Sequence, residues 1–95
     1  MTNSEIAALF RDIADRLKAR KDNIFKIRAY EKAAKAIESW DGDVEQLAKE
    51  VRLREIPGVG DAIEKKITEL VKTGRLEFYE KLKVDTNSFP LVKGD

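Results

Sequence analysis

Apolar residues recur every three or four positions along most of this 95-residue chain, and this spacing is typical of amphipathic helices. The first run comprises Ile6, Leu9, Phe10, Ile13 and Leu17. It predicts a helix from about Asn3 to Arg20, with Thr2 and Glu5 forming a capping box at its start. No segment shows a convincing strand pattern. The sequence therefore predicts an all-α fold.

Turn signals divide the rest of the chain into shorter helices. Their expected inward-facing residues are Ile27, Tyr30, Ala34 and Ile37 in the second helix, Val44, Leu47, Ala48 and Val51 in the third, Ile63, Ile67, Leu70 and Val71 in the fourth, and Leu76, Tyr79 and Leu82 in a short fifth. Asp43 is placed to cap the third helix, and Gly74 to end the fourth. We expect a compact bundle of four to five short helices in residues 1–83, followed by a flexible tail or linker in residues 84–95.

Composition excludes several classes of protein and of site. Hydrophobic residues make up 42% of the chain and charged residues 39%, which fits neither a membrane protein nor a disordered one. No apolar run approaches a membrane span and the first residues do not form a signal peptide, so we expect an intracellular protein of the cytoplasm or nucleoid, or of a eukaryotic nucleus. The chain has no Cys and no His, which removes disulfides, thiolate metal sites and the commonest general base.

The charged residues are distributed unevenly, although the net charge is only +1. The segment from residue 18 to 35 contains Lys18, Arg20, Lys21, Lys26, Arg28, Lys32 and Lys35 against only Asp22 and Glu31. The segment from residue 38 to 50 is acidic, with Lys49 as its one basic residue. A basic stretch is usually a solvated helix face, and it indicates phosphate binding only beside a second phosphate-binding feature.

Ile56-Pro57-Gly58-Val59-Gly60 supplies such a feature between the third and fourth helices. Two glycines let the backbone adopt positive φ and approach a ligand closely. The helix that follows begins with free N–H groups and the positive end of its dipole. A phosphate bound there by backbone donors would be recognised without regard to base sequence. The alternative interpretation is an ordinary glycine-rich turn between antiparallel helices.

Four segments, including the hairpin, extend this pattern along the chain in the same order and at similar separations as in a known family. They are Ile27-Arg28-Ala29-Tyr30-Glu31-Lys32-Ala33-Ala34, the hairpin Ile56–Gly60, Glu64-Lys65-Lys66-Ile67 and Thr73-Gly74-Arg75-Leu76. Through them the chain from about Ile6 to Leu82 resembles the N-terminal domain of family X DNA polymerases, the DNA polymerase beta group. The resemblance implies one helix-hairpin-helix motif that binds the 5′-phosphate side of a DNA gap in base-excision-type repair. In some members of that family the domain also removes a 5′-deoxyribose phosphate by lyase chemistry.

The resemblance also implies roles for individual residues. It places the Schiff-base lysine at Lys66, and phosphate-pocket residues at Lys26, Tyr30 and Arg54. It implies a monovalent cation, Na⁺ or K⁺, held by backbone carbonyls near Arg54, Ile56 and Val59, whereas the lyase chemistry itself requires no cofactor. The family's polymerase carboxylates lie in later domains, so this chain alone cannot polymerise, and a C-terminal polymerase domain is the implied partner. In the family a lysine is common at the position of Ala62, and a pocket histidine occurs at the position of Phe25. Both differences leave the phosphate site with fewer groups that can bind phosphate.

The helical repeat distinguishes the two neighbouring lysines of the fourth helix. Lys66 flanks the apolar stripe and is partly desolvated, as a lysine nucleophile needs to be, whereas Lys65 points away from the stripe. The alternative is that Lys66 only lies along the core edge and pairs with Glu69. We expect DNA contacts from Lys26, Tyr30, Arg54, Gly58, Val59, Gly60 and Lys65.

Three functions are compatible with these patterns. The leading one is a sequence-independent DNA domain that binds gaps or 5′-phosphate ends and carries lyase activity through Lys66. The second is a non-catalytic module that tethers a larger polymerase or repair enzyme to DNA. The third is a helical protein-interaction domain, against which the basic stretch and the hairpin argue.

Overall fold

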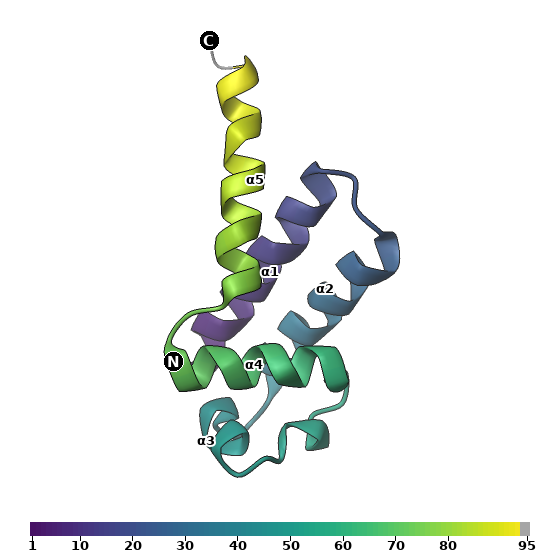
Figure 1. Cartoon of the computed structure of the whole chain (residues 1–95). Helices are drawn as coiled ribbons and strands as arrows, with labels where there is room; N and C mark the ends of the chain where they lie inside the picture. Colours follow the sequence, from purple (N-terminus) through teal and green to yellow (C-terminus); the bar gives the residue numbers. More distant parts are fainter. Residues whose placement is uncertain (94–95) are drawn as a thin grey trace.

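The computed structural model, which describes the backbone of residues 1–93 and the side chains of residues 1–85, is helical throughout (Figure 1). Its elements are α1 (Asn3–Ala19), α2 (Ile24–Ser39), α3 (Val44–Lys49), the 3-10 turn η1 (Leu53–Glu55), α4 (Asp61–Thr73) and α5 (Glu77–Lys93). The described residues include no strand, and the all-α prediction is confirmed.

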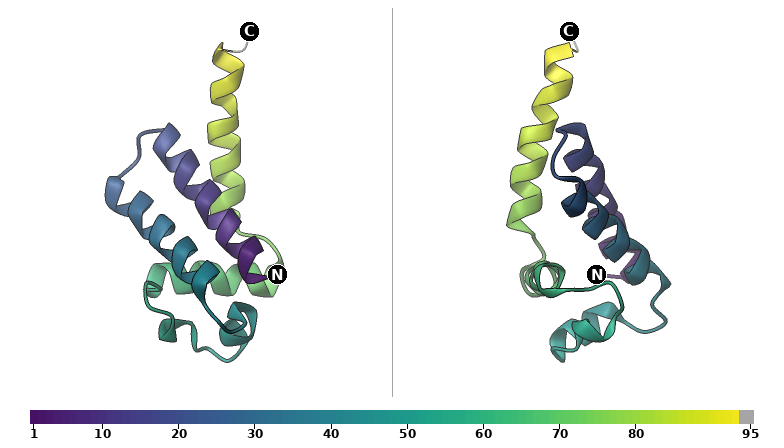
Figure 2. Two further views of the ribbon diagram at one scale, coloured as in Figure 1. Left: turned by 180° about the vertical axis from the view of Figure 1, so that it is seen from behind. Right: turned by 90° about the vertical axis from the view of Figure 1, so that its right-hand side faces the viewer.

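The helices pack around one end of an antiparallel pair. In both figures α1 and α2 run side by side, and α4 crosses the end of this pair opposite the α1–α2 loop (Figures 1 and 2). Helix α3 and η1 lie on the far side of α4, while α5 turns back along α1. The hairpin lies between η1 and α4 in the chain. It lies beside α2 in space, because Gly58 approaches Ala36 and Lys32 of that helix.

Side-chain caps fix the helix starts that the sequence indicates. Thr2 accepts a hydrogen bond from the backbone N–H of Glu5, and the Glu5 side chain accepts one from the N–H of Thr2, which completes the capping box. Asp43 caps α3 by accepting from the N–H of Glu45. Gly74 ends α4 with φ 76°, the left-handed conformation that favours glycine.

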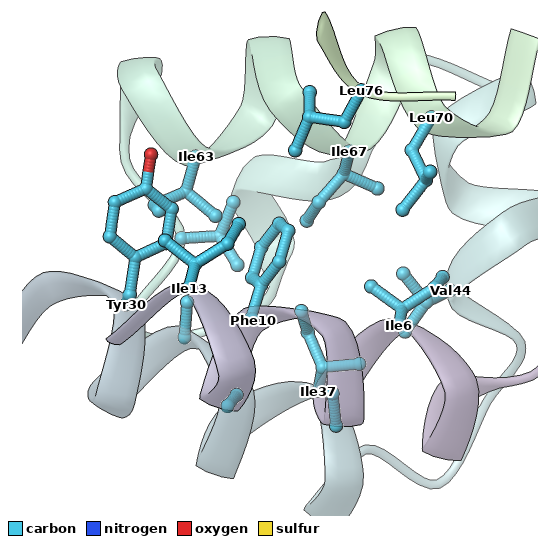
Figure 3. Packing of buried hydrophobic residues seen from close by; sticks show 14 of the residues in the cluster. Ile6, Phe10, Ile13, Tyr30, Ile37, Val44, Ile63, Ile67, Leu70 and Leu76 are labelled. Atoms are coloured by element: carbon cyan, nitrogen blue, oxygen red, sulfur yellow. The ribbon is translucent and has the colours of Figure 1, made fainter. Parts of the chain in front are cut away.

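One apolar cluster joins all five helices. Ile63, Ile67 and Leu70 of α4 point toward Ile6 and Phe10 of α1 (Figure 3). The largest fully buried side chains are Phe10, Ile6, Ile13, Leu17, Ile37, Leu53, Ile56, Ile67, Leu70, Leu76, Leu82 and Val44. Apart from Leu53 and Ile56, which lie in the connection before α4, these are positions that keep helical spacing in the sequence, so the apolar stripes face inward as expected.

The end of α3 corrects one core prediction. Helix α3 stops at Lys49, and Val51 lies after it with φ 57° and a side chain that is 80% exposed. The N–H of Arg52 donates to the carbonyl of Leu47 and the N–H of Val51 to that of Ala48. This hydrogen-bond pair is a Schellman ending, which turns the chain away before a further helical turn can bring Val51 inward.

Helix α5 differs from the expected loose tail. It continues as helix through Lys93, past Val84, where the sequence suggested that regular structure ends. The Tyr79 hydroxyl donates to Asp12 of α1 at 2.5 Å, and Arg20 at the end of α1 pairs with Asp85 at 3.2 Å. These contacts between elements distant in the chain support the helix where its own apolar pattern is weak. The division into a domain of 1–83 and a segment of 84–95 stays a prediction.

Candidate nucleic-acid interface

The hairpin is built on a type II turn. The Ile56 carbonyl accepts a hydrogen bond from the N–H of Val59 at 3.1 Å, with Pro57 and Gly58 as the two central residues. Gly58 has φ 100°, which the third position of this turn requires and which L side chains rarely adopt. Ile56 and Val59 are 1% and 5% exposed, so their side chains anchor the turn in the core and leave only backbone groups for a ligand.

Gly58 also lies against α2. A Cβ atom at this position would stand 3.4 Å from Cβ of Ala36 and 3.5 Å from Cγ of Lys32. The missing side chain therefore lets the hairpin approach α2 closely, and it leaves the aliphatic part of Lys32 alongside the turn. The sequence predicted a DNA contact at Gly58, and the structure gives this residue a clear role in the turn itself.

Gly60 faces open space at the start of α4. It is the N-cap residue, with φ −100° and no side-chain cap, and nothing lies within 4 Å of a Cβ atom built on it. Its carbonyl accepts the first intrahelical bond, from the N–H of Glu64 at 2.9 Å. The first N–H groups of α4 therefore have no partner inside the helix and open toward an unobstructed surface.

A pocket of ≈ 270 Å³ begins at this helix start and is bordered by α2, α4 and α5. Its lining residues are Lys26, Ala29, Tyr30, Ala62, Ile63, Lys66 and Phe78. The fold thus brings together Lys26, Tyr30 and Lys66, which the sequence singled out on two separate helices. Ala62 belongs both to the first turn of α4 and to the pocket lining, so the free N–H groups and the two lysines share one surface.

Two stacked aromatic rings line the pocket, and a third, buried ring ties them to the core. The Tyr30 and Phe78 rings stack with centroids 5.9 Å apart and planes 6° apart, and the Phe10 ring meets Tyr30 edge-on at 5.7 Å. Nζ of Lys66 lies 4.8 Å from the centroid of the Phe78 ring. Burial raises the pKa of the Tyr30 phenol, so its hydroxyl stays protonated at neutral pH and is available as a hydrogen-bond donor.

The two neighbouring lysines of α4 have different surroundings. Lys66 is half-buried at the pocket, whereas Lys65 is exposed and does not line it. Glu69, the partner expected if Lys66 were only a core-edge residue, instead accepts a hydrogen bond from the N–H of Glu77 at 2.9 Å. Lys66 therefore contacts an aromatic face in the pocket, and Glu69 is engaged with the start of α5.

Arg54 lies outside the pocket. It is on η1, before the hairpin, and forms an ion pair with Asp61 in the first turn of α4. The sequence grouped Arg54 with Lys26 and Tyr30, but the pocket lining includes only the latter two. A phosphate at the start of α4 would compete with Asp61 for the Arg54 guanidinium.

Ion pairs within the protein neutralise part of the basic stretch. Lys18 pairs with Glu31 at 2.5 Å, and Asp22 pairs with Arg20 at 2.8 Å and with Lys26 at 3.5 Å. The cations of the same stretch that form no ion pair with a described carboxylate are Lys21, Arg28, Lys32 and Lys35. The charge available to a polyanion is therefore smaller than the residue count suggests.

The sequence did not predict the positions of two aromatic residues relative to the pocket. Phe25, which replaces a histidine of the resemblance, is 74% exposed at the start of α2 and does not line the pocket. Phe78 does line the pocket but precedes the predicted stripe residue Tyr79 by one position, so helical spacing assigned it no role. Helix α5 packs on α1, and this placement brings the Phe78 ring to Tyr30 of α2 and to Lys66 of α4.

The described residues contain no helix long and apolar enough to cross a membrane, and no group of three or more acidic, Cys or His side chains arranged to hold a metal ion. The sequence model of the family described as helix-hairpin-helix domain matches residues 1–76, which is most of the chain.

Proposed function

The chain belongs to the helix-hairpin-helix domain family, which indicates DNA binding, and we propose that it binds DNA at gaps or 5′-phosphate ends without reading base sequence. The observation that carries this proposal is the position of Ala62, which joins the uncapped start of α4 to the pocket of Lys26 and Lys66. A terminal phosphate has more charge than an internal one and fits a site where backbone donors lie beside the Lys26 ammonium and the Tyr30 hydroxyl.

The Tyr30 hydroxyl and the Lys26 ammonium are the side-chain donors for that phosphate on α2. They are four residues apart and therefore project from one face of the helix. Lys26, which is exposed, also pairs with Asp22 at 3.5 Å, a long contact that a phosphate at closer range would outcompete. The absence of a lysine at position 62 leaves these two groups, with Lys66, as the polar lining of the pocket.

We further propose that Lys66 is the nucleophile of a 5′-deoxyribose-phosphate lyase. Nζ forms a bond to C1′ of the ring-opened abasic sugar, and the aldehyde oxygen leaves as water with two protons of the ammonium group. The resulting iminium keeps one positive charge and withdraws electrons from C2′. Loss of the C2′ proton then breaks the C3′–O3′ bond, and the downstream strand leaves with its 5′-phosphate. Hydrolysis of the remaining imine releases the unsaturated sugar phosphate and restores Lys66.

Water is the proton acceptor that we assign to the elimination step. No carboxylate is among the described residues that line the pocket, and Glu64, the nearest alternative by sequence, is half-buried elsewhere on α4. The steps require no metal and no organic cofactor. Tethering a C-terminal polymerase domain to a DNA gap inside the cell is the role that fits this activity.

A Na⁺ or K⁺ ion at the hairpin belongs to the same proposal. Carbonyl oxygens are the ligands that these ions take, and the Ile56 carbonyl keeps a lone pair besides the one that accepts from Val59. The backbone carbonyls of Arg54, Ile56 and Val59 would hold the ion, which would supply positive charge beside a bound phosphate.

Borohydride trapping on a duplex that ends in a 5′-deoxyribose phosphate tests the lyase proposal. The wild-type protein should form a covalent adduct. Lys66→Ala should lose most of that adduct while it keeps its DNA affinity, and Lys65→Ala, the matched exposed control, should retain it.

Trapping together with a DNA-binding measurement distinguishes the alternative functions. Undiminished trapping by Lys66→Ala would reassign the nucleophile to another amine. DNA binding without any trapping by the wild type would leave a non-catalytic tethering module. Absence of DNA binding even at low salt would leave the protein-interaction domain.

A further inference from the structure

We propose that Phe78 is a positioning residue for Lys66, and this inference rests on the proposed lyase function. The Phe78 ring holds the Lys66 nitrogen inside the pocket. Nothing in the apolar spacing of the sequence separates Phe78 from an ordinary exposed position of α5, so the role follows from the packing alone.

The geometry that supports this role is a stack of three groups. Tyr30 is fixed in the core by the edge-on Phe10 ring, Phe78 lies parallel to Tyr30 at 5.9 Å, and Nζ of Lys66 lies 4.8 Å from the Phe78 centroid. A cation within about 6 Å of a ring centroid is attracted by the negative face of the ring. Since the ring itself cannot swing away from Tyr30 without losing the stack, it offers a fixed location for a flexible side chain.

A fixed nitrogen matters because the lysine side chain has four rotatable bonds. An amine that samples many rotamers seldom meets C1′ of a bound sugar in the geometry for attack. The lining residues Ala29, Ala62 and Ile63 are apolar and give the ammonium no side-chain partner. The aromatic face is therefore the main attraction that keeps Nζ in the pocket.

The same face also suits the reaction intermediate. The resting ammonium and the iminium both have one positive charge on Nζ, so the attraction to the ring persists when the Schiff base forms. Phe78 thus holds the nitrogen in the same place before and after the Schiff base forms, and we expect this placement to raise the rate of adduct formation.

Replacement of Phe78 by leucine tests the proposal, with tyrosine at the same position as the conservative variant. Single-turnover trapping on the 5′-deoxyribose-phosphate duplex should slow by about fivefold or more in Phe78→Leu, because without the ring the Lys66 nitrogen occupies the pocket less often. The DNA concentration for half-maximal trapping should stay unchanged, because the phosphate contacts remain. Phe78→Tyr, which keeps the aromatic face, should trap at a rate within about twofold of the wild type.

A matched control lies one position along α5. Nζ of Lys83 lies 4.8 Å from the centroid of the Tyr79 ring, the same contact outside the pocket. Lys83→Met removes that contact and should leave trapping unchanged. If Phe78→Leu fails to fold by circular dichroism, Phe78→Met, whose unbranched side chain adapts to an irregular space, takes its place in the same comparison.

A second readout separates this inference from the lyase proposal. Pyridoxal 5′-phosphate is an aldehyde with a phosphate group, and borohydride fixes it on reactive lysines without DNA. Mass spectrometry should find Lys66 labelled in the wild type and in Phe78→Tyr but much less in Phe78→Leu. If this labelling pattern is found but the wild type shows no trapping on DNA, the positioning role is supported and the lyase proposal is overturned. Wild-type trapping and labelling rates in Phe78→Leu would overturn the positioning role alone.

Discussion

At the scale of single residues, two glycines of the hairpin have different roles although only Val59 separates them. Gly58 has φ 100° and packs against Ala36 and Lys32 of α2, so its lack of a side chain serves the turn and the packing. Gly60 has an extended backbone and faces open space, so its lack of a side chain keeps the start of α4 accessible.

Substitutions at these glycines should therefore separate stability from DNA binding. Gly58→Ala forces a Cβ atom into a left-handed conformation and within 3.4 Å of Ala36, and it should lower the free energy of unfolding by more than about 1 kcal/mol. Urea unfolding followed by circular dichroism measures this loss. A Gly58→Ala protein as stable as the wild type would contradict the turn geometry.

Gly60→Ser should show the opposite pattern. Serine is a good N-cap residue, so stability should stay the same or rise by about a few tenths of a kcal/mol. Its hydroxyl would accept from the N–H groups of α4 and occupy the place proposed for a phosphate, so affinity for 5′-phosphorylated DNA should fall. Unchanged affinity, measured by fluorescence anisotropy, would mean that the start of α4 does not contact DNA.

The sequence pointed to several residues of the pocket, but it did not show which other side chains lie beside them. The resemblance to family X polymerases pointed to Lys26, Tyr30 and Lys66, and the fold brings these three residues to one pocket. Arg54 was expected there and lies outside it, because its ion pair with Asp61 depends on the path of the hairpin. Phe78 was missed because contacts between α5 and two other helices decide where it lies, and no local periodicity encodes such contacts.

At the scale of helices, the end of α3 is a strained feature of the fold. Val51 is β-branched and holds φ 57°, a conformation unfavourable for any residue with a Cβ atom and more so for a branched one. Its side chain is 80% exposed and gains little from packing. Lys21, which ends α1 in the same way with φ 57°, has an unbranched Cβ and is less restricted.

Val51→Gly should therefore stabilise the protein by about 1 kcal/mol, because glycine adopts the left-handed conformation without steric cost. Lys21→Gly is the matched comparison and should stabilise it less. Thermal or urea unfolding of the two variants measures both changes. A Val51→Gly variant less stable than the wild type would indicate that the Val51 side chain has a stabilising contact.

The attachment of α5 to α1 is a second feature at this scale. Burial alone would raise the pKa of Asp12, but hydrogen bonds from Tyr79 and Arg16 outweigh it and hold the pKa of this carboxyl below its usual value. A carboxyl with a lowered folded-state pKa stabilises the fold above its unfolded-state pKa, and this contribution is lost as the pH falls through the folded value.

Tyr79→Phe removes the hydroxyl donor to Asp12 and should lower the free energy of unfolding by about 1–2 kcal/mol at pH 7. The difference from the wild type should shrink below about pH 4, where Asp12 becomes protonated in the unfolded chain and then in the folded one. Urea unfolding at several pH values gives this profile. A difference that stays constant in acid would show that the Tyr79 ring position matters rather than its bond to Asp12.

At the scale of the whole molecule, local signals accounted for the helices and the core, and the arrangement of helices needed the structure. Caps at Thr2, Asp43 and Gly74 and the apolar stripes were readable because they depend on neighbours within a few residues. The length of α5 was not, since its contacts with Asp12 and Arg20 join residues far apart in the chain.

The proposed DNA-binding surface lies where the start of α4 meets the pocket of Lys26 and Lys66. Its contacts with DNA are proposed to be mainly with phosphate, so affinity should fall steeply as salt rises because bound counterions are released. Salt dependence alone would also fit any basic surface, and only a preference for the terminal phosphate is specific to this site.

The most direct test is therefore to compare the affinities for a gapped duplex with and without a 5′-phosphate at one fixed salt concentration, by fluorescence anisotropy. The site predicts tighter binding of the phosphorylated gap, on the order of tenfold, which corresponds to about 1.4 kcal/mol. Lys26→Ala should reduce this preference and Lys65→Ala should keep it. Equal affinity of the wild-type protein for the two duplexes would contradict the account.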